Sequence, residues 1–173
     1  MALIVVDVEA DGPIPHKYSM VCFGAVVVEP SLAKTFYGQT RPVSDEYVEQ
    51  ALAVSGFSRA EHLMFDEPGE VMRRFEQWLR ENANGAAVFI SDNLAFDWQW
   101  INYYFHYFTG GNPFGFSGRR IGDLYAGLEK DYFAASKWKK FRRTRHTHDP
   151  VDDAKGNAEA LLKIREMGLK FPF

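Results

Sequence analysis

The sequence predicts an α/β fold: a mixed, five-stranded β-sheet flanked by α-helices. Three short strand-forming segments lie within residues 2–40, and helical patterns then alternate with two further strand-forming segments. Helices that alternate with strands in this way pack on the faces of a sheet. With 173 residues, the chain has the size of one ordinary domain, and we expect residues 1–173 to form a single domain.

Residues 2–8 predict a buried strand because they are apolar and rich in valine, and Gly12-Pro13-Ile14-Pro15 then breaks the pattern. Residues 20–29 predict a second strand and residues 34–40 a third. The Glu29-Pro30-Ser31 turn joins them closely enough for an antiparallel hairpin. Residues 86–91 and 119–122 predict the fourth and fifth strands.

Five segments predict helices. The helix over 67–82 is amphipathic, with Val71, Phe75 and Leu79 on one face. The helix over 93–108 is rich in aromatic residues and ends at Gly110-Gly111. Its stripe of Trp100, Tyr104, Phe105 and Phe108 indicates packing against the sheet. The other predicted helices cover residues 45–54, 123–128 and 150–167.

The composition excludes several classes of protein. A chain that is 46% hydrophobic and 16% aromatic is neither disordered nor fibrous. Its one cysteine, Cys22, excludes an internal disulfide and a cysteine-rich zinc site. No stretch reaches the ~20 apolar residues needed to span a membrane. The apolar residues 2–6 lack the length and basic flank of a signal peptide, so we expect a cytoplasmic protein without membrane partners.

The net charge of −3 conceals one basic segment. Six basic residues and no acidic ones lie within residues 137–145, and the remainder has 14 basic against 23 acidic residues. Such a run can be a solvated loop. Trp138 and Phe141 interleave the charges, however, which is typical of surfaces that bind phosphates and stack bases. The basic residues are Lys137, Lys139, Lys140, Arg142, Arg143 and Arg145.

Asp7 and Glu9 stand two residues apart at the end of the first predicted strand, so their side chains leave the same face. Their Cα atoms should lie ~7 Å apart, at ~3.3–3.4 Å per residue. Carboxylates so placed can converge on a pair of metal ions ~3.5–4 Å apart. An isolated pair of acids with this spacing is more often simply solvated. Here, however, the two acids lie at the end of an apolar strand.

Asp97 lies early in the helix that follows the fourth predicted strand. If Asn93 is the N-cap, Asp97 is the fourth helical residue, where an acid also complements the helix dipole. Asp92 offers an alternative cap or a supporting acid. Asp97 is therefore a candidate metal ligand or a structural acid.

His148 and Asp153 meet at the start of the last predicted helix. Asp149 is a natural N-cap and Pro150 suits the first helical position. His148 then precedes the cap and Asp153 is the fourth helical residue, two positions that come together in space. Asp152, third in the helix, can bond back to the N–H of the cap, so we assign it a structural role. His146 lies further from the helix start and has the features of a solvated histidine.

Taken in order, these residues resemble the DEDDh branch of the DnaQ-like 3′–5′ exonucleases. The first motif of that family, D-x-E, matches Asp7-Val8-Glu9. The second, N-x-x-F-D, matches residues 93–97, and the third, H-x-x-x-x-D before alanine, matches His148, Asp153 and Ala154. The resemblance implies a ribonuclease H-like fold, consistent with the element order above.

The resemblance also implies roles. Asp7 would bridge two divalent ions, Mg²⁺ or Mn²⁺, with Glu9 and Asp153 completing the shell of one and Asp97 holding the other. His148 would take a proton from the attacking water. The backbone at Ala10 would contact the terminal nucleotide. Basic residues after Trp138 would bind the substrate backbone: Lys139, Lys140, Arg142, Arg143 and Arg145.

The expected partners are the 3′ ends of single-stranded RNA or DNA, and the expected products are nucleoside 5′-monophosphates. Similarity to small stand-alone exoribonucleases favours RNA over DNA and makes a homodimer plausible. A DNA-directed exonuclease and a binding module of the same fold that does not cleave remain as alternatives. The module is disfavoured because it would not need all five site residues.

Overall fold

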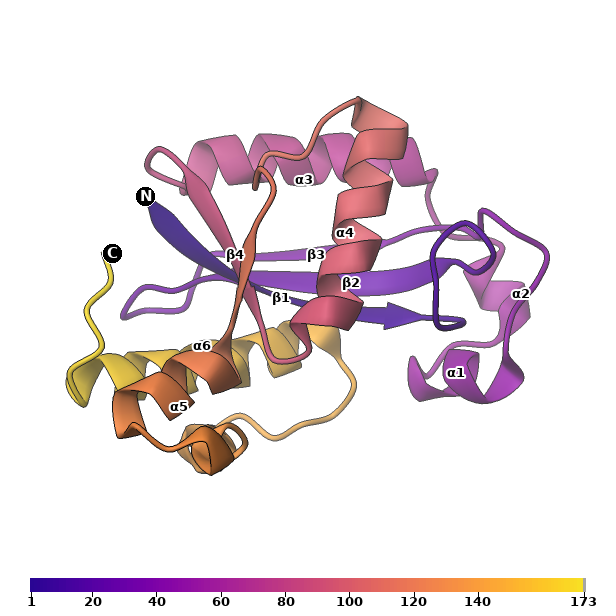
Figure 1. Ribbon diagram of the computed structural model, residues 1–173. Coiled ribbons are helices and arrows are strands. Elements are labelled where there is room, and N and C mark those ends of the chain that lie inside the picture. The colour runs from indigo at the N-terminus through magenta and orange to yellow at the C-terminus, as the bar shows by residue number, and fades with distance from the viewer. Residues whose placement is uncertain (173) are drawn as a thin grey trace.

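A five-stranded mixed sheet forms the centre of the computed structural model, which describes residues 1–172 (Figure 1). In the order β3-β2-β1-β4-β5, β2 is antiparallel to both of its neighbours, β3 and β1, and β4 runs parallel to both β1 and β5. The predicted fold class and the hairpin of the second and third strands are therefore confirmed. The strands are β1 (Ala2–Ala10), β2 (Met20–Val27), β3 (Thr35–Gln39), β4 (Ala87–Ser91) and β5 (Gly118–Arg120).

Helices cover both faces of the sheet. Figure 1 shows α3 and α4 on one face, α5 and α6 on the other, and the short α1 and α2 near the end of β1. None of the helices within residues 1–172 is long and apolar enough to cross a membrane. The α-helices are α1 (Glu49–Val54), α2 (Arg59–His62), α3 (Pro68–Asn82), α4 (Leu94–Thr109), α5 (Ile121–Glu129) and α6 (Pro150–Glu166); the 3₁₀ helices are η1 (Tyr132–Ala134) and η2 (Lys137–Phe141).

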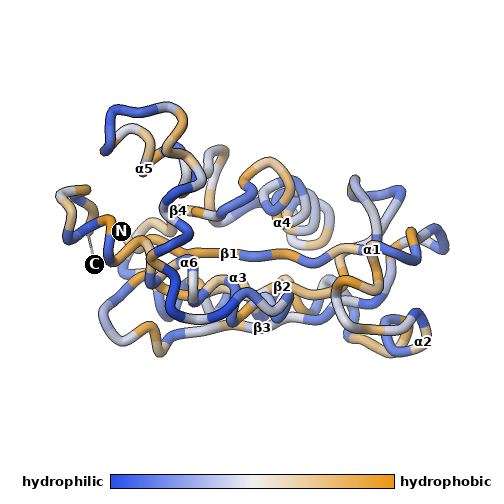
Figure 2. The backbone as a smooth tube through the Cα atoms, turned by 90° about the horizontal axis from the view of Figure 1, so that it is seen from below, coloured by the Kyte–Doolittle hydropathy of each residue, from blue (hydrophilic) through white to orange (hydrophobic). Residues whose placement is uncertain are grey.

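The side chains of β1 alternate between two large hydrophobic cores, one on each face of the sheet. Val6 belongs to the core under α3 and α4, while Leu3 and Val5 belong to the core with α6. Because side chains of a strand alternate between faces, Asp7 and Glu9 continue the row of Leu3 and Val5 towards α6. Figure 2 shows β1 as hydrophobic on its N-terminal side, with hydrophilic stretches towards its end near α1.

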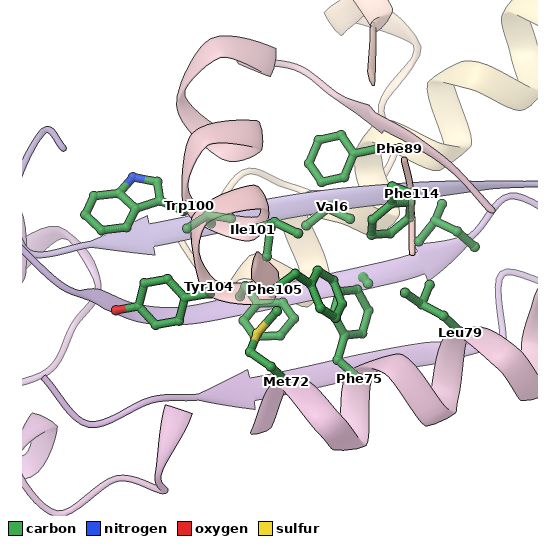
Figure 3. Close-up of a cluster of buried hydrophobic side chains, with 14 of the residues drawn as sticks. Val6, Met72, Phe75, Leu79, Phe89, Trp100, Ile101, Tyr104, Phe105 and Phe114 are labelled. Carbon is green, nitrogen blue, oxygen red and sulfur yellow. The ribbon is translucent and has the colours of Figure 1, made fainter. Parts of the chain in front are cut away.

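The first core is largely aromatic. Trp100 and Tyr104 of α4 are fully buried, and the Phe75 ring of α3 lies 5.5 Å from that of Phe105 (Figure 3). The predicted aromatic stripe of α4 therefore packs against the sheet and α3, although Phe108 is only partly buried.

Trp138 is the main correction to the sequence analysis. Its side chain is fully buried in the second core, which also holds Leu161 and Ile164 of α6. The indole is thus unavailable to stack on bases, and the interpretation of Trp138 as part of a binding surface is wrong. The burial fixes η2, and with it the neighbouring basic residues, against α6.

Some helix boundaries also differ from the prediction. The helix predicted over 45–54 begins only at Glu49, because the backbone N–H of Val48 donates instead to the carbonyl of Asp11 at 2.7 Å. The unpredicted α2 has a capping box, in which the Ser58 hydroxyl accepts from the N–H of Glu61 and the Glu61 carboxylate accepts from the N–H of Ser58. This S-x-x-E signal was present in the sequence.

Gly24 permits the close approach of α6 to the sheet. It pairs with Asp7 across β1 and β2. A Cβ atom at Gly24 would lie 2.4 Å from the carbonyl carbon of Pro150 and 2.5 Å from the nitrogen of Val151. Because glycine has only a hydrogen atom as its side chain, the first turn of α6 can lie directly over β2, beside Asp7.

We predict that Gly24→Ala lowers the free energy of unfolding by about 1–3 kcal/mol, because the methyl group overpacks a contact made by backbone atoms. Urea unfolding would measure the loss. Gly127→Ala in α5 is the matched control, since its added Cβ meets nothing within 4 Å. That variant should gain roughly 0.5–1 kcal/mol from the helix preference for alanine. Equal stability of the Gly24→Ala variant and the wild type would contradict the tight fit.

Candidate active site at the end of the sheet

Carboxylates from β1 and α6 meet at one point. Asp7, Glu9 and Asp153 each offer an oxygen atom, and these atoms lie within 4.8 Å of one another. The start of α6 is fixed as the sequence predicted: Asp149 is the N-cap, its carboxylate accepting from the N–H groups of Val151 and Asp152 at 2.9 and 3.1 Å. The predicted bond from Asp152 to the cap is wrong, because the N–H of Asp149 donates to the Thr147 hydroxyl instead.

Asp97 joins this group from the first turn of α4. Its side chain is buried, and Oδ1 accepts a hydrogen bond from the N–H of Val8 at 3.1 Å. That N–H lies between Asp7 and Glu9 on β1, so the bond holds the fourth carboxylate beside the other three. Asn93 is the N-cap of α4, as predicted, but its side chain makes no cap bond.

Burial and mutual repulsion disfavour charge on these carboxylates. Burial raises the pKa of Asp7 well above its ordinary value, and the nearby charges of Asp97, Asp153 and Glu9 raise it further. Burial also raises the pKa of Glu9, although His148 opposes this shift. Clustered carboxylate oxygens are the donor set that Mg²⁺ and Mn²⁺ prefer, and a divalent cation would relieve the repulsion. The residues present therefore fit a divalent metal.

His148 lies at the solvent side of this cluster. Its Nδ1 is 3.3 Å from Oε1 of Glu9, and its side chain is 49% exposed. The backbone has φ 63°, a left-handed conformation that is uncommon outside glycine. The Asp153 carboxylate holds this turn by accepting from the N–H groups of Thr147 and His148 at 3.1 and 3.0 Å. The Asp153 side chain thus both belongs to the carboxylate cluster and positions the imidazole of His148.

Two further side chains contact Asp153. Arg142 Nη2 lies 3.0 Å from Oδ1, and Nδ1 of His146 lies 2.6 Å from Oδ2. Neither contact was foreseen. Arg142 was expected on the substrate backbone, but its largely buried guanidinium is engaged with a carboxylate of the site. His146 is exposed, as predicted, but the sequence did not indicate its contact with Asp153.

The other basic residues of the segment lie at the surface. Lys139 pairs with Asp92 at 2.6 Å, whereas Lys140, Arg143 and Arg145 are exposed. The loop that carries them is tied to α6 by Glu159, whose Oε2 accepts from the N–H groups of Arg143 and Thr144 at 2.8 and 2.7 Å. The path from η2 to His148 is therefore fixed by α6 over much of its length.

An apolar cleft of about 320 Å³ opens beside Glu9. Ala10 forms part of it, and Phe96 of α4 lines it as well. Phe96 also packs against the first core, with its ring 6.1 Å from that of Trp100. The remaining lining residues are Gly12, Pro13, Val48, Ala51 and Val54.

A buried polar cluster holds the α1 side of this cleft. Asp11 accepts from the N–H of Ser19 at 2.5 Å and pairs with Arg59 of α2 at 2.9 Å. Arg59 also donates to the carbonyl of Ser44 at 2.7 Å. Burial raises the pKa of Asp11 to about 6, while Ser19 and Arg59 oppose that shift. His62, which the sequence did not distinguish, lies fully buried beside Asp11, and burial lowers its pKa to about 4.

Comparison with known proteins adds independent evidence. No protein-family profile matches the chain. The chain is 35% identical over 177 residues to the 3′–5′ DNA exonuclease Cap18 of Escherichia coli, an alignment that covers 96% of this chain and 93% of that protein. This level of identity over nearly the full length of both proteins is evidence of a shared family.

Solved structures share the fold. The nuclease domain of 3′hExo, a DEDDh family member bound to rAMP, superposes with a TM-score of 0.77 at 16% identity, covering 96% of this chain and 92% of that one. Exonuclease I of E. coli in complex with a dT13 oligonucleotide has a TM-score of 0.69 at 13% identity and matches 95% of this chain and 41% of its own length.

We predict that Asp97→Asn removes a pH-dependent penalty on the metal-free protein. Burial raises the pKa of Asp97 to about 8, and the charges of Asp92 and Glu9 contribute to the increase. In the unfolded chain the pKa is about 4. Between these values the folded state binds more protons, so the free energy of unfolding falls as pH rises and the penalty is complete above pH 8. The stability of the variant relative to wild type should therefore rise from about pH 4 to about pH 8.

Thermal and urea unfolding in EDTA would measure this difference. Asparagine retains an oxygen that can accept from the N–H of Val8, so the comparison isolates the charge. Added Mg²⁺ at pH 8 should stabilise the wild type more than the variant. A stability difference that does not change with pH would contradict the assigned burial penalty.

Proposed function

Because the chain belongs to the DEDDh branch of the DnaQ-like 3′–5′ exonucleases and has their ribonuclease H-like fold, we propose that it removes nucleotides from the 3′ ends of single-stranded DNA. The observation that carries the proposal is the convergence of Asp7, Glu9 and Asp153, with Asp97 bonded to the same strand. The relative that shares 35% of its sequence is named a DNA exonuclease.

The four carboxylates would hold two divalent ions, Mg²⁺ or Mn²⁺, which when bound supply Lewis acidity to the attacking water and to the departing 3′ oxygen. The protein's part is to gather these acids on rigid elements. Asp7 and Glu9 are fixed by β1, Asp97 by its bond to Val8, and Asp153 by the first turn of α6.

His148 would act as the general base. Its imidazole is half exposed and lies beside Glu9, where one nitrogen can accept the proton of a water molecule. The oxygen of that water bonds to phosphorus as the bond from phosphorus to the 3′ oxygen of the preceding nucleotide breaks. The products are a nucleoside 5′-monophosphate and a strand shortened by one residue with a free 3′ hydroxyl.

The apolar cleft beside Glu9 would receive the terminal nucleotide. Ala10 and Phe96 offer it an apolar surface next to the carboxylates. Among the side chains that line the cleft, only Glu9 is polar. The choice of DNA, in place of the RNA preference suggested by the sequence alone, rests on the 35%-identical relative, which is named a DNA exonuclease.

The strand leading to the site would pass the exposed basic residues Lys140, Arg143 and Arg145. Their charges can neutralise phosphates without reading sequence. Lys139 is also at the surface, although it forms an ion pair with Asp92. RNA remains the second candidate substrate, because the nuclease domain of 3′hExo, a structure of the same fold, is bound to rAMP.

We predict that the protein shortens single-stranded DNA from the 3′ end faster than RNA of matched sequence. With a 5′ label, products should appear as a descending ladder, and with a 3′ label the mononucleotide should appear at once. EDTA should abolish both. Asp7→Asn is the inactive control, because Asp7 is central to the carboxylate cluster. Faster digestion of RNA would replace DNA with the second candidate, and no digestion of either would leave the non-cleaving module.

We predict that His148→Ala lowers kcat by about 10²–10⁴-fold, the usual contribution of a general base, while divalent metal binding is retained. Single-turnover kinetics and metal titration would separate the two effects. His148→Asn should be similarly impaired; since asparagine tolerates the left-handed backbone, its loss cannot be assigned to strain. His106→Ala, an exposed histidine on α4, is the control. Full activity of both His148 variants would exclude His148 as the base.

A further inference from the structure

Two histidines lie together above Asp153. His146 and His148 occupy alternate positions in the loop before α6, and their ring centroids are 4.4 Å apart. Nδ1 of His146 lies 2.6 Å from Oδ2 of Asp153. Within residues 1–172, His146, His148 and Asp153 form a second group of metal-ligating side chains, each with a ligand atom within 4.8 Å of the others.

The donor atoms of this group differ from those of the carboxylate cluster. Two imidazole nitrogens and one carboxylate oxygen suit Zn²⁺ and related transition metals, whereas Mg²⁺ prefers oxygen ligands throughout. We propose that His146, His148 and Asp153 form a binding site for Zn²⁺, separate in its nitrogen ligands from the carboxylate cluster but sharing Asp153 with it. Nothing in the family resemblance assigns His146 a role.

The geometry permits such a site. Ligands at ~2.0–2.1 Å from a tetrahedral zinc ion lie ~3.3 Å from one another. The present separations bracket that value, from 2.6 Å between His146 and Asp153 to the 4.8 Å limit for the group. The imidazoles are 55% and 49% exposed, so both can rotate, and solvent can supply a fourth ligand.

Asp153 provides the fixed point. Its side chain is 1% exposed and is held by Arg142 and by the N–H groups of Thr147 and His148. Hydrogen bonds of this kind orient a carboxylate for metal binding. A zinc ion held by Nδ1 of His146 and Oδ2 of Asp153 would replace their present 2.6 Å contact with two bonds to the metal.

Binding has a consequence that rests on the proposed exonuclease function. A His148 nitrogen that coordinates Zn²⁺ cannot accept a proton from water. Zinc would therefore inhibit the enzyme in the presence of excess Mg²⁺, by removing the base and by occupying an Asp153 oxygen that the carboxylate cluster would otherwise use. The site would couple activity to the concentration of a transition metal.

Binding can be tested without nucleic acid. Zn²⁺ would be titrated calorimetrically into the protein in excess Mg²⁺, and Co²⁺ would report nitrogen ligation through its visible absorption. The expected result is one ion per chain. His146→Ala and His146→Gln should each weaken binding by at least about tenfold, as loss of even a supporting residue does. His106→Ala should bind as the wild type does. Unchanged affinity in both His146 variants would overturn the site.

Inhibition is then measured against the Mg²⁺-dependent activity of each variant. The zinc concentration for half inhibition should rise by at least about tenfold in both His146 variants and stay unchanged in His106→Ala. Equal zinc sensitivity in all of them would overturn the regulatory role and place the inhibitory ion among the carboxylates alone. If the protein digests no substrate, the proposed function fails, while the calorimetric result still decides whether the site exists.

Discussion

Four carboxylates repel one another at the end of the sheet, and the surrounding structure must hold them there. The repulsion is strong because the groups are removed from water, as the raised pKa values of Asp7, Glu9 and Asp97 reflect. The opposing contacts are few and specific. Arg142 places a positive charge on Asp153, and the N–H of Val8 donates to Asp97. Under the proposed function, a bound divalent cation would offset the remaining repulsion.

The precision of this arrangement depends on close backbone contacts at some distance from the acids. Gly24 lets α6 approach β2 opposite Asp7, and Gly156 lets the loop before α6 lie against the helix, since a Cβ there would meet the Thr144 carbonyl at 2.9 Å. Glu159 then fixes the same loop through two N–H groups. The position of His148 is thus determined mostly by α6, which also carries Asp153.

The sequence predicted those features of the fold and the site that depend on interactions between residues close together in the chain. The alternation along β1 placed Asp7 and Glu9 on one face, and the Asp149-Pro150 signal placed the start of α6, so the fold and the convergence of the acids could be read in advance. The contacts of Arg142 and His146 with Asp153 could not be predicted, because they depend on how the loop crosses α6. The exposure of Trp138 was wrongly predicted for a related reason. A tryptophan among lysines is expected at the surface, but one face of η2 packs into the core. The short α1 likewise reflects the tertiary contact of Val48 with Asp11.

The end of β1 also links the chemistry to substrate choice. Glu9 points to the carboxylate cluster, Ala10 lines the apolar cleft, and Asp11 anchors the segment that forms the opposite wall through Arg59 and the N–H of Val48. Under the proposed function, these consecutive residues would supply a metal ligand, part of the nucleotide-binding surface and a structural support. Because α1 contributes Ala51 and Val54 to the cleft but no carboxylate to the cluster, changes in α1 would then alter which nucleotide fits while the metal ligands stay in place. Glu9 borders both the cleft and the carboxylate cluster, so under the proposed function it would connect substrate binding to cleavage.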